Sequence, residues 1–158
     1  MQTSLKTQIV SAEYCHLLWY PRFIRLSKKI ENVQRQATKI VPCLKNLSYD
    51  ERLRKLRLPT LKYRRLRGDM LNVYKILNDD NKGSSHLLPL HESSHATRGH
   101  NKKLQKNRYK CNFRKFSFTL RVTNQWNSLS KKTTNAVDIN QFKKLLDDEL
   151  CNVMYEYD

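Results

Sequence analysis

Cationic side chains at helical spacing are the feature of this sequence that most directly indicates a chemistry, the binding of phosphate. Segment 58–77 carries Arg64, Arg65, Arg67 and Lys75 among apolar residues that recur every three or four positions. At about 100° per residue, Arg64 and Lys75 project almost opposite the apolar stripe, and Arg65 and Arg67 lie on its flanks. One helix would thus turn an apolar side to a core and a cationic side to an acidic ligand.

The charge of the whole chain extends this pattern. The 158 residues include 31 Lys and Arg against 14 Asp and Glu, a formal charge of +17. Residues 20–75 hold 16 basic and 4 acidic side chains, and residues 98–132 hold 11 basic and no acidic ones. Such an imbalance favours a polyanionic partner, with nucleic acid before an acidic membrane surface. We predict phosphate contacts from Lys28, Arg35, Lys39, Arg52, Lys55, Arg64, Arg65, Arg67, Lys75, Arg98, Lys102, Lys103, Arg108, Lys110 and Arg114, and base stacking from Tyr109 and Phe113.

Asp79 and Asp80 form the one acidic pair that resembles a metal-binding pair of a nucleotidyl transferase. Such a pair belongs at the end of a buried strand or hairpin. Here it follows a helical pattern and precedes Lys-Gly-Ser-Ser, so we interpret it as a helix end. With no Gly-rich phosphate loop and no nucleophile beside a base, we expect no catalytic activity of this chain alone.

Four histidines fall between residues 86 and 100, and His91 and His95 have the HxxxH spacing of a zinc finger's second half. No cysteine pair supplies the other ligands and there is no HExxH motif, so we expect a polar loop without metal and predict no cofactor. The four cysteines lie far apart, and no apolar run is long enough to span a membrane. We therefore expect an intracellular protein, nuclear or cytoplasmic, without signal peptide or membrane partner.

Apolar periodicity predicts four helices in the first half of the chain: residues 4–18, 28–41, 49–57 and 58–77. Ser27 is the expected N-cap of the second helix, and Ser48 to Glu51 form a capping box for the third. In the second helix the shared apolar face, which we expect to be buried, consists of Leu26, Ile30, Val33, Ala37, Ile40 and Val41. In the third, Arg52, Arg54, Lys55 and Arg57 are expected to face solvent or ligand.

The second half begins without periodicity. Residues 78–104 have the composition of a loop, and residues 108–113 alternate like a short strand. Residues 116–129 predict a buried helix, and a capping box at Asp138 to Gln141 opens a last amphipathic helix that continues to Val153. The predicted fold is mainly α, a helical bundle of about five to six helices with a long irregular middle loop and at most a short strand. We divide it into a basic helical lobe (1–78), a linker (79–105) and a C-terminal helical lobe (106–158).

The sequence IENVQRQATK at residues 30–39 resembles the I-E-x-V-Q-R-R-A-T-K segment of LINE-type, non-LTR retrotransposon reverse transcriptases of the jockey and chicken-repeat groups. Five further segments follow in that family's order, at residues 47–53, 58–77, 97–100, 121–129 and 142–147. The chain departs from the pattern at Gln36, Asn101 and Ser130, where the family usually has Arg, Ser and Pro. The resemblance covers about residues 10–147.

The resemblance implies the C-terminal part of such an enzyme, the thumb that grips the primer–template backbone and what lies beyond it. The endonuclease, fingers and palm would then lie upstream of Met1, and the chain would be a fragment or degraded copy. Two hypotheses remain open. The first is a non-catalytic module that binds RNA, DNA or an RNA–DNA hybrid without sequence selectivity. The second is a structural or protein-interaction remnant whose basic faces pack on the missing polymerase and endonuclease domains. Salt-dependent nucleic-acid affinity separates them.

Overall fold

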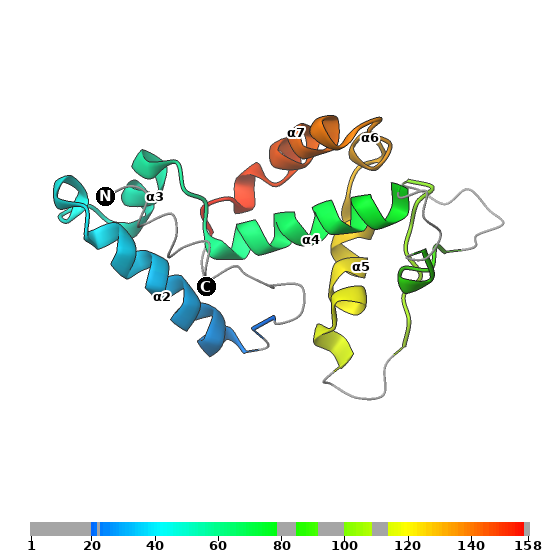
Figure 1. Ribbon diagram of the computed structural model, residues 1–158, viewed down its shortest axis with the longest axis horizontal. Coiled ribbons are helices and arrows are strands. Elements are labelled where there is room, and N and C mark those ends of the chain that lie inside the picture. The colour runs from blue at the N-terminus through cyan, green and yellow to red at the C-terminus, as the bar shows by residue number, and fades with distance from the viewer. Residues whose placement is uncertain (1–19, 22, 79–84, 92–99, 109–113, 157–158) are drawn as a thin grey trace. The chain divides into compact units, whose positions relative to one another are not determined.

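A computed structural model describes residues 20–21, 23–78, 85–91, 100–108 and 114–156, and this part of the chain is mainly helical, as predicted (Figure 1). Its α-helices are α2 (Ile24–Lys39), α3 (Tyr49–Leu56), α4 (Leu61–Asn78), α5 (Phe118–Ser128), α6 (Lys131–Thr134) and α7 (Ile139–Glu149). Short 3₁₀ turns lie at Pro42–Leu44, Ser85–Leu87, Arg114–Phe116 and Cys151–Val153. Among the described residues the only extended pairing is an isolated antiparallel bridge between Leu90 and Leu104. No described helix is long and apolar enough to cross a membrane.

The chain divides into two compact units. Unit 1 comprises Met1–Leu66 and Asn152–Asp158, and unit 2 comprises Arg67–Cys151. Helix α4 begins in unit 1 and continues into unit 2. These bounds differ from the three-part division expected from the sequence at residues 78 and 105. The expected helix at residues 4–18 and most of the expected strand at 108–113 lie outside the described residues.

Helix α2 of unit 1 starts earlier and faces another way than the sequence predicts. It begins at Ile24 after the extended residue Phe23, which forms no side-chain cap, so the predicted N-cap at Ser27 is wrong. The buried residues of α2 are Glu31, Gln34, Ala37 and Thr38, whereas Leu26, Val33 and Ile40 are 43%, 51% and 63% exposed. Ala37 is buried as predicted, but the prediction is wrong for Leu26, Val33 and Ile40, because hydrogen-bonded polar side chains occupy the core-facing positions.

Glu31 is the centre of that polar packing. One carboxylate oxygen accepts a hydrogen bond of 2.6 Å from the hydroxyl of Tyr49, and the other accepts from the backbone N–H of Leu61 at 3.1 Å. Gln34 donates its amide to the carbonyl of Pro59 at 3.1 Å. An anionic group at the first N–H of α4 also complements the positive end of the helix dipole. Glu31 and Gln34 thus connect α2 to Tyr49 at the start of α3 and to the start of α4.

Helix α3, which contacts α2, begins with the predicted capping box. Ser48 accepts a hydrogen bond from the backbone N–H of Glu51, and the Glu51 carboxylate accepts from both the hydroxyl and the backbone N–H of Ser48. These two bonds, the one from the hydroxyl first, hold the pKa of Glu51 below its usual value. The helix ends at Arg57 in the left-handed conformation, φ 52°. After Pro59, the hydroxyl of Thr60 accepts a hydrogen bond from the N–H of Tyr63 and donates one to the carbonyl of Met154. The second bond connects the start of α4 to the C-terminal segment of unit 1.

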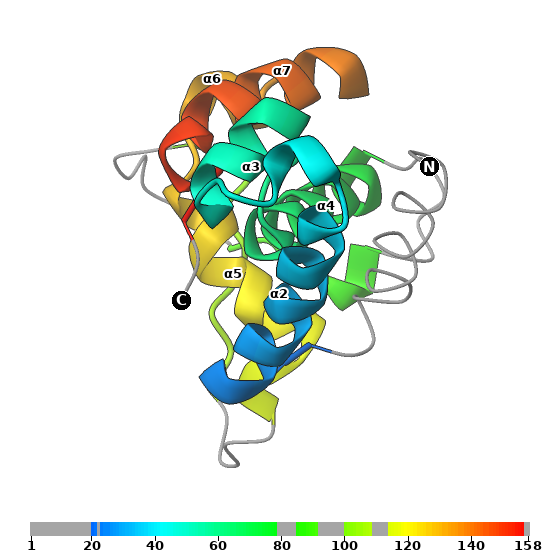
Figure 2. The same ribbon diagram turned by 90° about the vertical axis from the view of Figure 1, so that its left-hand side faces the viewer.

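The core of unit 2 is built from aromatic side chains of α4, α5 and α7. The ring of Phe142 stacks on that of Tyr74 at 4.3 Å between centroids and lies 6.0 Å from that of Trp126. Phe142 and Trp126 are fully buried, and the hydroxyl of Tyr74 donates to the carbonyl of Ala136 at 2.9 Å. Burial raises the pKa of that hydroxyl. Helices α6 and α7, which close this core, lie side by side in both views (Figures 1 and 2).

Two helix starts in unit 2 differ in detail from the predictions. Phe116 lies in a 3₁₀ turn, and α5 begins after Ser117. At α7, Asp138 caps the N–H of Gln141 as predicted, but the Gln141 side chain accepts from Val137 rather than from Asp138, so the capping box is incomplete. Helix α7 also ends at Glu149, before the predicted end.

Candidate nucleic-acid interface

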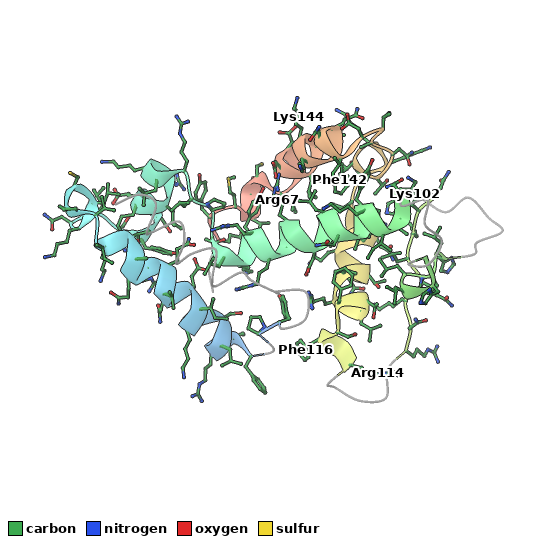
Figure 3. All side chains as sticks on the ribbon, in the orientation of Figure 1. Arg67, Lys102, Arg114, Phe116, Phe142 and Lys144 are labelled. Atoms are coloured by element: carbon green, nitrogen blue, oxygen red, sulfur yellow. The ribbon has the colours of Figure 1, made fainter. Side chains whose placement is uncertain are left out.

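A ligand-sized hollow in unit 2 lies at the N-terminus of α5. It measures about 320 Å³ and is lined by Asn107, Arg108, Arg114, Ser117, Thr119 and Leu120. Two of the predicted phosphate-binding residues, Arg108 and Arg114, are therefore brought to one cavity from the two sides of segment 109–113, which lies outside the described residues. Arg114 projects beside the start of α5, next to Phe116 (Figure 3).

Both arginines of the cavity are exposed. Neither guanidinium forms an ion pair or a hydrogen bond with another residue in the described ranges. A guanidinium that is not already paired keeps its five donors for a ligand, and its planar fork matches two oxygens of a phosphate. These two cations are therefore ready to accept an anionic ligand.

The start of α5 adds further donors. Ser117 occupies the N-cap position, but its side chain does not accept from the helix. Its hydroxyl donates instead to the carbonyl of Arg114 at 2.8 Å and lies 3.4 Å from the hydroxyl of Thr119. The first N–H groups of the helix are thus left without a side-chain cap, and such an end attracts phosphate through its N–H groups and the helix dipole.

A buried ion pair fixes the direction of this helix end. The guanidinium of Arg121 donates to the two carboxylate oxygens of Asp69 in α4 at 2.8 and 2.9 Å, and the side chains are only 10% and 5% exposed. The same guanidinium lies over the ring of Phe118, 5.4 Å from its centroid, and contacts the carbonyl of Phe116. Neither Asp69 nor Arg121 was a predicted site residue, and their pairing across 52 residues leaves no local signal in the sequence.

Segment 100–108 leads to the cavity and is held along α5 by backbone contacts. Asn127 accepts from the N–H of Leu104 at 2.8 Å and donates to its carbonyl at 3.0 Å, while the indole of Trp126 donates to the carbonyl of Lys102. The ammonium of Lys102 reaches Asn78 at the end of α4, at 3.0 Å (Figure 3). Lys102 and Lys103 are half-buried on this segment.

His100 starts the same segment and is buried. Its Nε2 lies 3.1 Å from the carbonyl of Trp126 and must donate, because a carbonyl only accepts; Nδ1 is buried without a partner. Burial lowers the pKa of the imidazole, so the neutral form is favoured. Within the described ranges no three His, Cys, Asp or Glu side chains gather as metal ligands. His95 and the Asp79–Asp80 pair lie outside these ranges.

Several other predicted contact residues have roles inside the protein. Arg52 was expected to face solvent or ligand, but it is 3% exposed, donates to the carbonyl of Leu47 and lies over the ring of Tyr49, so this prediction of exposure is wrong. Arg65, predicted on the flank of its helix, is buried. Arg67 forms a bidentate pair with Asp147 of α7 at 2.5 and 2.9 Å (Figure 3).

The remaining predicted residues stay on the surface or outside the described ranges. Arg35 is half-buried over the ring of Tyr49 at 4.9 Å, and Arg64 is half-buried. The exposed cations are Lys28, Lys39, Lys55 and Lys75, and Arg98, Lys110, Tyr109 and Phe113 lie outside the described residues. Of the predicted contact residues that the structure describes, Arg108 and Arg114 line the hollow at the start of α5. The charge pattern of the sequence did not predict Asn107, Ser117 and Thr119 as site residues, although a serine just before a helical run is a signal of a helix start.

Comparisons with protein-family models, with curated proteins and with solved structures find no match for this chain.

Proposed function

We propose that this chain binds the phosphate backbone of RNA or DNA without sequence selectivity, and that it derives from the thumb and post-thumb part of a LINE-type reverse transcriptase. The observation that carries the binding proposal is the cavity at the start of α5, where two exposed arginines that pair with no other described residue lie beside a helix end that Ser117 does not cap. The derivation rests on the six sequence segments that follow the family's order.

The composition of the cavity favours phosphate over other ligands. The described side chains that line it offer guanidinium, hydroxyl and amide donors, and neither a carboxylate nor an imidazole is among them. Donors of this kind suit a phosphodiester, which is anionic and accepts hydrogen bonds on its non-bridging oxygens. Backbone contacts carry no base information, so affinity without sequence preference follows. A hydroxyl without a base beside it is a poor nucleophile, which favours binding over catalysis.

The test compares two double variants that remove equal charge. Arg108→Ala/Arg114→Ala removes the cavity cations, and Lys131→Ala/Lys132→Ala removes two exposed lysines from α6. Fluorescence anisotropy with a labelled 20-nucleotide single strand and a duplex is measured at several salt concentrations. Each lost phosphate contact lowers the slope of log K against log salt by roughly 0.7 to 0.9, so the cavity variant should lose about 1.4 to 1.8 for both ligands.

The control variant should change the slope by less than half of that amount. Equal losses in both variants would show only that net charge matters, and the cavity would not be the site. A folded chain with no nucleic-acid affinity even at low salt would leave the alternative hypothesis, a part whose cations pack on other polymerase domains.

A further inference from the structure

Helix α2 and its C-cap residue Ile40 carry an apolar row that the other described residues of unit 1 leave exposed. Leu26, Val33 and Ile40 follow one another at intervals of seven residues and are 43%, 51% and 63% exposed. Seven residues are close to two helical turns, so the three side chains line up along about 21 Å of the helix.

The row is left outside by the way α2 packs. Glu31, Gln34 and Thr38 face the core and are 7%, 1% and 0% exposed, and the hydrogen bonds of Glu31 and Gln34 tie α2 to Tyr49, Pro59 and Leu61. At about 100° per residue, the centre of these buried positions lies some 130° from the row. Turning α2 to bury the row would break those bonds and leave a buried carboxylate unsatisfied. The fold therefore stabilises an arrangement in which α2 presents apolar side chains to solvent.

Cations lie along one side of this row, away from the buried positions: at about 100° per residue, Lys29 and Arg25 are about 40° and 80° from its centre, and Lys39 and Lys28 are about 120° and 140° from it. Arg25, Lys28, Lys29 and Lys39 of α2 are exposed, and no described residue pairs with them. The one acidic residue of the helix is Glu31, which is buried. The accessible surface of α2 thus has an apolar strip with a positive margin on one side.

We propose that α2 binds an amphipathic helix of a partner protein, one that carries acidic residues beside its apolar stripe. Side chains repeated every seven residues match the seam along which two helices pack, and acidic residues beside that seam complement the basic margin formed by Lys29 and Arg25. A second copy of this chain would bring like charges together on a protein of net charge +17. A membrane-bound helix needs a broad apolar face, whereas this row covers an arc of only about 40°. The inference concerns unit 1 and does not depend on the phosphate cavity of unit 2.

The test uses the full chain and two labelled 21-residue peptides, without nucleic acid. One consists of three Glu-Ile-Ala-Ala-Leu-Glu-Glu heptads, and the other has the same residues in an order without heptad spacing. The heptad peptide should bind at least tenfold more tightly than the reordered one. Leu26→Gln/Val33→Gln/Ile40→Gln should reduce its binding to the level of the reordered peptide.

Matched variants complete the design. Lys28→Gln/Lys39→Gln changes two exposed residues of the same helix away from the row and should reduce binding less than the triple variant does. Arg108→Ala/Arg114→Ala should leave it unchanged. Circular dichroism checks folding, and Val33→Gln alone replaces the triple variant if that one unfolds. Equal binding of the two peptides, or heptad binding that survives substitution of the row, would overturn the proposal. The proposal would also be overturned if substituting the row reduced only the binding to phosphatidylserine vesicles, or only the self-association measured by sedimentation.

Discussion

The buried pair between Asp69 and Arg121 gives the sharpest prediction, because a second pair of the same chemistry in unit 2 serves as its control. Asp69→Ala removes the carboxylate that pairs with the guanidinium of Arg121, whose side chain is only 10% exposed. Removing one partner of a buried pair costs about 3–5 kcal/mol, a large share of the roughly 5–15 kcal/mol by which domains are stable. Asp147→Ala breaks the pair with Arg67, whose side chains are 28% and 39% exposed, and should cost less than about 1 kcal/mol.

Urea unfolding followed by the fluorescence of the fully buried Trp126 measures both changes. The substitution Trp19→Phe leaves Trp126 as the one tryptophan of the chain, so the signal reports unit 2. With a slope of about 1.5 kcal/mol per molar urea, Asp69→Ala should lower the midpoint by roughly 2 to 3 M without changing the slope. Replacing both partners, as Asp69→Leu/Arg121→Met, should recover much of that loss. If Asp147→Ala costs as much as Asp69→Ala, burial does not decide the strength of these pairs and the reasoning is refuted.

Three further predictions concern other buried groups. Burial lowers the pKa of His100, so the contribution of this imidazole to stability is complete above the unfolded pKa of about 6.5 and is lost as the pH falls. The unfolding midpoints at pH 7.5 and pH 5 should therefore differ more for the parent than for His100→Gln. Tyr49→Phe removes the bond to the Glu31 carboxylate and should cost about 1.5–3 kcal/mol in thermal or urea unfolding, and an unchanged midpoint would contradict the polar core of unit 1. Phe142→Ala should cost about 3–5 kcal/mol, against about 0.5 kcal/mol or less for the exposed Lys144→Ala, and similar costs would refute the packing of unit 2.

Local patterns in the sequence predicted the helices well and their orientation less well. The apolar periodicity of residues 58–77 and the capping box at Ser48 depend on neighbours within one or two turns, and the structure has the corresponding helices α3 and α4. The buried face of α2 depends instead on partners 18 to 30 residues away, the hydroxyl of Tyr49, the carbonyl of Pro59 and the N–H of Leu61. A periodicity that weighs only hydrophobicity counts Glu31 and Gln34 as solvent-facing, because it contains no information on such distant hydrogen bonds.

The candidate site shows the same limit. Charge counts identified Arg108 and Arg114, but they also selected Arg52, Arg65 and Arg67, which the fold buries or pairs internally. Arginine suits both uses, since its fork binds a carbonyl or carboxylate within the protein as readily as a phosphate outside it. Only the tertiary contacts of each guanidinium separate the two uses.

Titration of the ¹⁵N-labelled chain with a 12-nucleotide oligouridylate, followed by NMR, tests the proposed phosphate site most directly. The backbone amides of Phe118, Thr119 and Leu120 and the Nε–H groups of Arg108 and Arg114 should shift most, and these shifts should vanish at high salt. Large shifts confined to unit 1 or to α6 and α7, with the start of α5 unchanged, would contradict the proposal.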